Sequence, residues 1–353
     1  MCWKSAARCR YCNRVFARRL SVALLLLLSS LQARAADCFG TTTLAGCFSV
    51  LGVTGPAEPS PFRTLSLGRT LPAESFALSA NSWYIIRPAE LVASSPDPAG
   101  RTIDVVSRAT VIDLRAAAGV GRRLDLTLAL PVFVDIRGAG NDAIATQKPA
   151  PFQGAALGDP RVGLRTSLLP ASIRDWRLML RNEWTLPLGN NTHYAGDLAV
   201  TSTFAATGVR HYQGWSAALD LGLLSAPAVR FGDVRLGTSA IFGLGFARDI
   251  ITNNILSIGL EAWAKPVLVA PPTKDSPSSN ISRVVPAEWL LNVQWHPESQ
   301  PCWFWLGGGG ALPLSQRETT DALRVDTSFI APSTARIRLG LGLGLILDAA
   351  PAH

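Results

Sequence analysis

The sequence is poor in charge and, beyond its first residues, has no long apolar run. Only 16% of its 353 residues are Asp, Glu, Lys or Arg, whereas 48% are hydrophobic. This balance excludes a disordered chain and a long coiled coil. No apolar run after residue 36 reaches the roughly 18 residues that a membrane-spanning helix needs. Another kind of structure must therefore use the hydrophobicity.

Residues 1–36 are predicted to be a secretory signal peptide. They contain seven basic residues and no acidic one, and an apolar core at 20–31 is followed by small residues at 33–36. An uncleaved signal anchor is the alternative, although so short a core barely spans a bilayer. Removing the segment lowers the formal net charge from +8 to +1, so the electrostatic basis for nucleic-acid binding disappears. We expect Sec-type export and no nucleic-acid partner.

Few cysteines remain after export. Three of the six lie in the signal peptide, and Cys38, Cys47 and Cys302 are left in an oxidising compartment. A disulfide between Cys38 and Cys47 could close a small loop, and Cys302 would then have no cysteine partner within the chain. No cysteine–histidine cluster has metal-ligand spacing, so we expect neither a metal nor a cofactor.

The body of the chain alternates with a period of two. Residues 124–136 carry Leu, Val or Ile at every even position, while the odd positions are mixed and include Asp125 and Asp135. Residues 337–347 repeat the pattern, with arginine and glycine between the aliphatic residues. A strand places such sets on opposite faces, whereas a helix would mix them. At 176–186, tryptophans bracket the aliphatic residues, as an aromatic girdle requires.

Extending this interpretation gives about twelve strands, most of them long enough to cross a tilted bilayer. They are expected at 75–86, 108–120, 124–137, 160–169, 176–188, 200–212, 215–224, 235–248, 255–268, 284–296, 303–312 and 335–347. Short connections alternate with long polar ones along the whole chain. This asymmetry is typical of outer-membrane barrels, which have short periplasmic turns and long extracellular loops.

The sequence therefore predicts an all-β fold, a transmembrane antiparallel up-and-down β-barrel of about 12 strands. A soluble secreted sandwich or solenoid is the alternative, with the aliphatic faces forming a shared core. The predicted organisation is a signal peptide at 1–36, a periplasmic N-terminal lead at 37–70, the barrel at 71–348 and a short tail at 349–353. Residues 37–70 are ambiguous, and a plug inside the barrel is their second interpretation.

The polar faces of the strands predict a charged lumen. The expected pore-lining residues are Asp113, Arg115, Asp125, Asp135, Arg137, Arg161, Arg165, Arg177, Arg181, Glu183, Arg210, Asp220, Arg235, Glu261, Lys265, Glu288, Arg336 and Arg338. In a hydrated pore, their basic surplus would favour anions. In a filled lumen, opposite charges would pair between strands. Glycines at alternate luminal positions would either admit side chains from the opposite wall or keep a passage open.

Several short motifs resemble a known family. The run Leu157-Gly-Asp-Pro-Arg-Val-Gly-Leu-Arg165 is similar to a segment of OmpA-like barrels and of MetA-type outer-membrane transporters associated with phenol degradation. The strand at 126–135, the run at 184–189 and the closing strand at 335–347 fit the same order. The resemblance covers roughly residues 62–347 and implies a transporter in the bacterial outer membrane.

We therefore expect a porin-like or hydrophobic-solute channel in the outer membrane of a Gram-negative bacterium. Its partners would be outer-membrane lipid, the periplasmic and barrel-assembly machinery, and small solutes. The alternative is a non-transporting structural or surface-exposed barrel with a closed lumen. An outer-membrane hydrolase using His193 beside Asp197 is a third hypothesis, but no histidine has a convincing nucleophile partner, so an enzyme is not expected.

Overall fold

The structure is a computed structural model of the chain. It describes residues 36–37, 49–53, 55–93, 101–121, 123–140, 151–169, 175–190, 193–197, 199–227, 229–231, 234–251, 255–268, 285–297, 300–313, 328–329 and 334–347. The predicted signal peptide up to residue 35, the Cys38–Cys47 disulfide and the tail at 349–353 lie outside the described residues. Among the residues that are described, no helix is both long and apolar enough to cross a membrane.

The described secondary structure consists of strands. These are β1 (Ala36–Asp37), β2 (Phe76–Ala93), β3 (Arg101–Gly119), β4 (Leu124–Gly138), β5 (Phe152–Leu157), β6 (Arg161–Ser167), β7 (Trp176–Thr185), β8 (Thr201–Tyr212), β9 (Trp215–Ser225), β10 (Val229–Phe231), β11 (Val234–Leu236), β12 (Ser239–Ile251), β13 (Leu256–Ala264), β14 (Ala287–Trp295), β15 (Cys302–Ala311), β16 (Ser328–Phe329) and β17 (Ile337–Leu347). The short strands β1, β10 and β11 form a small separate sheet.

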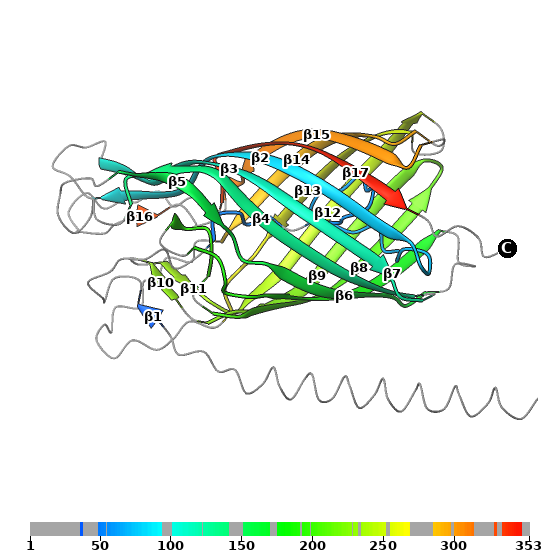
Figure 1. The fold of residues 1–353 in the computed structure, drawn as a ribbon, viewed down its shortest axis with the longest axis horizontal. Helices are drawn as coiled ribbons and strands as arrows, with labels where there is room; N and C mark the ends of the chain where they lie inside the picture. Colours follow the sequence, from blue (N-terminus) through cyan, green and yellow to red (C-terminus); the bar gives the residue numbers. More distant parts are fainter. Residues whose placement is uncertain are drawn as a thin grey trace, which may run out of the picture. The chain divides into compact units, whose positions relative to one another are not determined.

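The long strands form a closed antiparallel barrel. Neighbouring strands pair in the order β2-β17-β15-β14-β13-β12-β9-β8-β7-β6-β4-β3, and β2 pairs with β3 to complete the circle. Figure 1 shows the tilted strands around a common axis, with short connections at one end and long ones at the other. We call these the turn end and the loop end. The predicted twelve-strand up-and-down barrel is confirmed.

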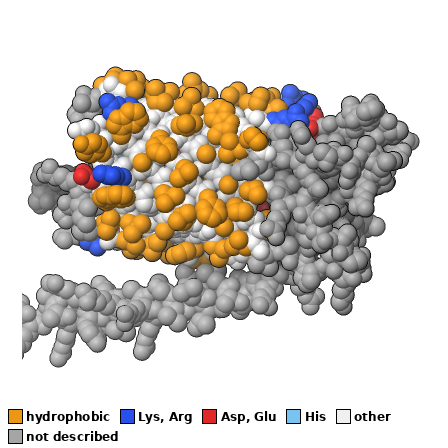
Figure 2. Space-filling model, turned by 180° about the vertical axis from the view of Figure 1, so that it is seen from behind, with side chains coloured by type: hydrophobic (Ala, Val, Ile, Leu, Met, Phe, Trp, Pro, Cys, Tyr) orange, Lys and Arg blue, Asp and Glu red, His pale blue; other side chains and the backbone are white. Residues whose placement is uncertain are grey.

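The two faces of the wall differ as the alternation predicts. Aliphatic side chains such as Leu128, Leu341 and Leu343 are about half exposed on the outer face, and Figure 2 shows this apolar surface over the strands. Outward aromatic residues gather at the turn end, where Trp176 and Trp215 lie under the guanidinium groups of Arg210 and Arg248. An apolar band bordered by aromatic residues is the surface that a lipid bilayer requires.

All twelve expected strands are present, and most of their ends lie within about four residues of the prediction. The exceptions are β2 and β3, which continue to the loop end through the expected connection at 87–107. Their extensions pair with each other, with register shifts between Ile86 and Leu91. Arg87 has a positive φ of 49° beside Pro88, so a bulge absorbs the proline that suggested a loop.

A bulge in β4 reverses part of the predicted alternation. Thr110 pairs with Asp135, but Val111 pairs with Phe133, so one residue of β4 is extra. Beyond this point Ile136 is fully buried, whereas Asp135 and Arg137 share the outer face with Arg108. Because a one-residue slip turns every side chain to the other face, the prediction that Asp135 and Arg137 line the lumen is wrong.

The wall is interrupted between β5 and β6. Both strands pair with β4, in different halves, but Gly158, Asp159 and Pro160 separate them. β7 pairs with β6 only as far as Thr185, opposite Arg161. Toward the loop end, the second edge of β5 therefore meets no strand among the described elements.

Glycines on the luminal face of β17 make room for indole rings. A Cβ atom at Gly340 would come within 2.6 Å of Trp83 and within 2.5 Å of Trp305, and one at Gly344 would overlap Trp303. The three tryptophans project from the neighbouring strands β2 and β15 and are buried. The glycines thus admit large side chains from adjacent strands.

We expect Gly344→Ala to lower the free energy of unfolding by about 1–3 kcal/mol, because the added methyl group must displace the Trp303 ring. Gly208→Ala is the matched control, since nothing lies within 4 Å of a Cβ atom there. Thermal unfolding of the two variants checks the prediction. Equal melting temperatures would contradict the tight packing of Trp303.

Candidate functional site

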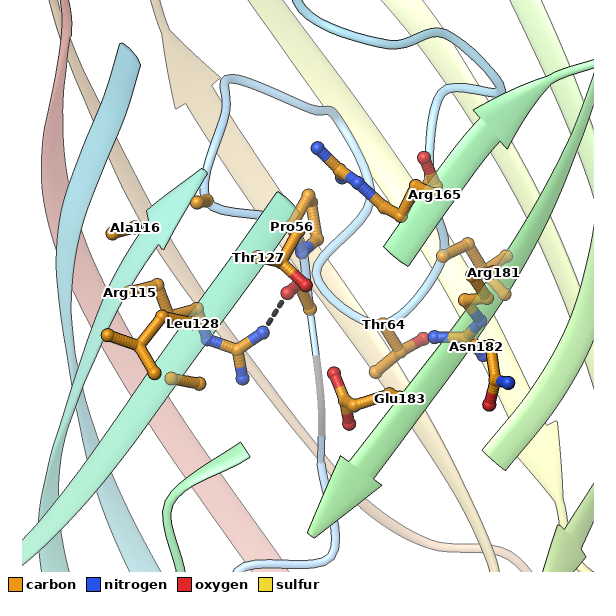
Figure 3. Close-up of a pocket in the computed structure, with 15 residues that line it drawn as sticks. Pro56, Thr64, Arg115, Ala116, Thr127, Leu128, Arg165, Arg181, Asn182 and Glu183 are labelled. Atoms are coloured by element: carbon orange, nitrogen blue, oxygen red, sulfur yellow. Dashed lines mark hydrogen bonds between the residues drawn. The ribbon is translucent and has the colours of Figure 1, made fainter. Parts of the chain in front are cut away.

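The lumen is occupied by the chain that precedes β2. Residues 49–53 and 55–72, here called the luminal segment, are almost entirely buried up to Gly68, including the side chains of Phe62 and Leu65. Figure 3 shows Pro56 and Thr64 on a loop that runs among wall strands carrying Arg115, Arg165 and Arg181. The segment at 37–70 was expected as a periplasmic lead; its described residues from 49 on instead lie inside the barrel, as in the second interpretation, a plug.

The luminal segment runs along the barrel from the loop end to the turn end. At the loop end, the backbone N–H of Val50 donates to the carbonyl oxygen of Tyr194 at 3.1 Å. Near the turn end, the backbone N–H of Leu71 donates to Asp125 Oδ1 at 2.9 Å. Between them, Asn292 Nδ2 on β14 donates to the carbonyl oxygen of Pro61 at 3.0 Å. Several strands of the wall thus satisfy its backbone groups, which have no regular secondary structure to pair with.

An ionic cluster joins the segment to the wall. Glu58 of the segment lies 2.5 Å from Arg165 Nη1, and Asp125 lies 2.8 Å from Arg165 Nη2. Nearby, Arg115 pairs with Asp113 and donates to the carbonyl oxygen of Gly55. All these charged side chains are nearly inaccessible to solvent. Buried charges of this kind must be paired, because an unpaired one costs several kcal/mol.

Other luminal charges pair within the wall. Arg181 on β7 lies 2.6 Å from Asp220 on β9, and Arg338 on β17 lies 2.9 Å from Glu288 on β14. Opposite charges therefore pair between strands, in agreement with the filled-lumen interpretation rather than with a free arginine lining.

Thirteen of the eighteen predicted pore-lining residues face the interior of the barrel or its rims. They are Asp113, Arg115, Asp125, Arg161, Arg165, Arg177, Arg181, Glu183, Asp220, Glu261, Lys265, Glu288 and Arg338. Five lie elsewhere. Asp135 and Arg137 are on the outer face, Arg210 lies over the outward Trp176, Arg336 pairs with Glu90 before β17 begins, and Arg235 belongs to β11 of the small sheet.

The sequence-based list omitted the inward-reaching residues of the luminal segment itself. Glu58, Arg63 and Thr64 are buried and bond to wall residues more than a hundred positions away. No periodicity marks them. The available signal was a pair of isolated charges within an apolar, proline-rich stretch.

An apolar cluster surrounds the first residues of the luminal segment. Val50, Leu51 and Val53 of the luminal segment belong to one buried cluster, which we call the apolar chamber. Its wall is made of Trp83, Ile85, Val105, Val106, Ala109, Val111, Phe133, Ile136, Ala156, Tyr194, Ala195, Trp263, Leu290, Trp303 and Trp305. The buried pair Arg165–Asp125 lies near the turn end and Arg181–Asp220 near the middle of the barrel, whereas the buried pair Arg338–Glu288 lies near the loop end, at the starts of β17 and β14.

A loop covers the interruption in the wall. Residues 186–190 and 193–197, here called the cover loop, bond to the ends of β5 and to the break itself, for example through Asn190 N–H to the carbonyl oxygen of Leu157 at 2.8 Å. Asp159 holds this loop, because its carboxylate accepts the backbone N–H of Gly189 at 2.7 Å and of Asp197 at 2.5 Å. At this place the barrel wall is a loop rather than a strand.

The cover loop also holds the luminal segment. The backbone N–H of Ser49 donates to Asp197 Oδ1 at 3.0 Å. Burial raises the pKa of Asp197 to about 6, and the nearby carboxylate of Asp159 acts in the same direction, while Ser49, Arg161 and Lys265 oppose the shift. Asp197 therefore serves as an anchor for the segment.

A small cavity remains between the luminal segment and the wall. It has a volume of about 40 Å³ and lies among Thr64, Arg115, Arg165, Arg181 and Glu183 (Figure 3). This is space for water rather than for a solute. At this place the luminal segment and the wall leave no room for a solute.

Comparison with known proteins identifies the fold. No family model and no curated protein matches the chain. Its structure is similar to the COG4313 outer membrane channel from Pseudomonas putida F1, with a TM-score of 0.56 and 12% identity, covering 79% of this chain and 98% of that one. The toluene transporter TodX of P. putida gives a TM-score of 0.41 at 11% identity, covering 91% and 100% of the two chains. A FadL homologue of Pseudomonas aeruginosa gives 0.36 at 9%, covering 89% and 98%.

We expect Arg165→Met to lower the free energy of unfolding by about 3–5 kcal/mol, because it leaves Glu58 and Asp125 buried without their shared partner. Arg123→Met, at an exposed turn residue, is the matched control. Thermal or denaturant unfolding of both variants provides the test. A loss no larger than that of the control would show that the cluster does not hold the segment.

Acidic pH should strengthen the docking of residues 49–53. Undocking exposes Asp197 and returns its pKa toward 3.8, so the stabilisation is complete below about pH 4 and is lost as the pH rises through about 6. Single-channel recordings should show fewer openings at about pH 4 than at about pH 7. Asp197→Asn should remove most of this difference. An unchanged pH dependence in the variant would assign it to another group.

Proposed function

We propose that this protein is a MetA-type channel of the Gram-negative outer membrane that carries hydrophobic solutes and is closed by its luminal segment. The apolar chamber is the observation that carries the proposal. A general porin needs a continuous aqueous passage, whereas here the interior around Val50, Leu51 and Val53 is lined mainly by aromatic and aliphatic side chains. Solutes that prefer this environment to water are apolar.

The interruption beside β5 offers such a solute a way out of the chamber. An apolar molecule continuing to the turn end would have to pass the ion pairs of Arg165 and Arg181, where desolvation of charge is costly. The cover loop borders the chamber instead, through Tyr194 and Ala195, and Phe152 packs on the same cluster. Movement of this loop would connect the chamber with the outer face of the barrel.

A non-transporting barrel is the second candidate, and the filled lumen favours it. The luminal segment and the ion pairs fill much of the described interior, and the cavity beside Thr64 and Arg115 has a volume of only about 40 Å³. The two candidates differ in whether the chamber admits a solute. Transport requires that Val50, Leu51 and Val53 leave the chamber, and hydrogen bonds of this stretch to Tyr194, Asp197 and Lys265 hold it there.

Filling the chamber beside the wall interruption should block transport. Ala156→Trp places an indole next to Phe133, and we expect the uptake of phenylnaphthylamine by cells carrying the variant to fall severalfold, with ion conductance unchanged. Ala217→Trp, at an exposed position on the outer face of β9, is the control. Uptake that is equal for the wild type, both variants and cells lacking the protein would leave the closed barrel as the function.

A further inference from the structure

One arginine of the luminal segment stacks on the tryptophans of β15. The guanidinium carbon of Arg63 lies 5.3 Å from the ring centroid of Trp303 and 5.1 Å from that of Trp305. Its Nη2 donates to Gln294 Oε1 on β14 at 2.9 Å. The faces of indole rings and an amide oxygen all present negative potential, so the wall offers Arg63 a site that selects a positive charge.

A carboxylate of the wall completes this site. Four buried luminal carboxylates, Asp113, Asp125, Asp220 and Glu288, each pair with an arginine of the wall. Glu261 on β13 is equally buried but has no ion pair with a wall side chain among the described residues. Its oxygens accept only from the luminal segment: from Arg63 N–H at 2.5 Å, from Thr64 N–H at 2.8 Å and from Leu65 N–H at 3.2 Å, besides the Thr64 hydroxyl.

The site belongs to the wall and not to the segment. Trp303 and Trp305 lie over the glycines of β17, and Trp305 Nε1 donates to Asn81 Oδ1 on β2 at 2.8 Å, so this ring is held without Arg63. Two other luminal cations, Arg338 and Lys265, also stack on indole rings, but both are residues of the wall. Among the described residues, Arg63 is the stacked cation that departs if the segment leaves the lumen.

We propose that Trp303, Trp305, Gln294 and Glu261 form a binding site for an organic cation, an ammonium or guanidinium group on an apolar solute, and that Arg63 occupies it as an internal ligand in the closed state. The inference rests on the proposed function, since it names a charge that the transported solute would carry. Removal of the segment leaves Glu261 without its hydrogen bonds from residues 63–65 and the two indole faces without their cation, and an organic cation with N–H or O–H donors would compensate both losses.

Calorimetric titration of the full chain in non-ionic detergent tests the site, with choline as the probe and its uncharged isostere, in which a tert-butyl group replaces trimethylammonium, as the reference. Arg63→Ala should bind choline about tenfold more tightly than the wild type, because the competing guanidinium is gone. Arg63→Lys, which keeps the charge, should bind as weakly as the wild type. Arg69→Ala, at an exposed residue of the same segment, is the control.

Two further measurements separate the site from a general loosening of the segment. In Arg63→Ala, the additional change Glu261→Gln should abolish the gain for choline and leave the weak binding of the isostere unchanged. Equal gains for choline and the isostere, or a gain that persists without Glu261, would overturn the cation site. Circular dichroism confirms that each variant is folded.

The outcome is distinguishable from failure of the proposed function. If Arg63→Ala shows no preference for choline while phenylnaphthylamine uptake by the wild type persists, the channel is one for neutral solutes and the cation site is wrong. If choline binds but no apolar probe is taken up, the site stands and the transport proposal fails.

Discussion

The need to compensate buried charge and to fill enclosed space governs this barrel. Its wall is closed mainly by backbone pairing between strands, yet the enclosed side chains include groups that the wall leaves without partners. Arg165 pairs with both Asp125 of the wall and Glu58 of the segment. Within the described part of the chain, the hydrogen bonds of the Glu261 carboxylate all come from the luminal segment. Because low dielectric makes every unmet polar group costly, the segment is part of the fold as much as the strands are.

The strands could be predicted because the bilayer and the lumen impose opposite demands on alternate residues. The pattern at 337–347 leaves a single register in which leucines meet lipid. The prediction of inward and outward faces fails where a bulge shifts the register of a strand. The residues around Val134 give no sign of the extra residue in β4, because the alternation of the sequence continues through the bulge. The prediction therefore placed Ile136 on the outer face and Arg137 in the lumen. Register depends on the partner strand, which a single segment does not specify.

The candidate site was less predictable for the same reason. The luminal residues of the wall can be predicted because inward and outward side chains alternate along a strand. Their partners lie in an irregular segment, which has no such alternation. Thr64 meets Glu261 across 197 positions of sequence, and Asn292 meets the carbonyl group of Pro61 across 231. Such contacts depend on the three-dimensional closure of the barrel. The prolines and isolated charges of residues 56–63 indicated an irregular segment, but not which surface it would fit.

The luminal segment is anchored differently along its length. Toward the turn end, Glu58 forms a buried ion pair with Arg165 and the backbone N–H of Leu71 donates to Asp125, so breaking either contact leaves a buried charge or donor without a partner. At the loop end, Val50 and Leu51 rest on apolar side chains, and hydrogen bonds from Lys265 to the carbonyl oxygen of Gly52 and from Ser49 N–H to Asp197 hold the adjoining backbone. Because a hydrogen bond costs less to break than a buried ion pair, the proposed displacement would start at the loop end, beside the cover loop, and Arg63 would leave its site only once the contact of Glu58 is also broken.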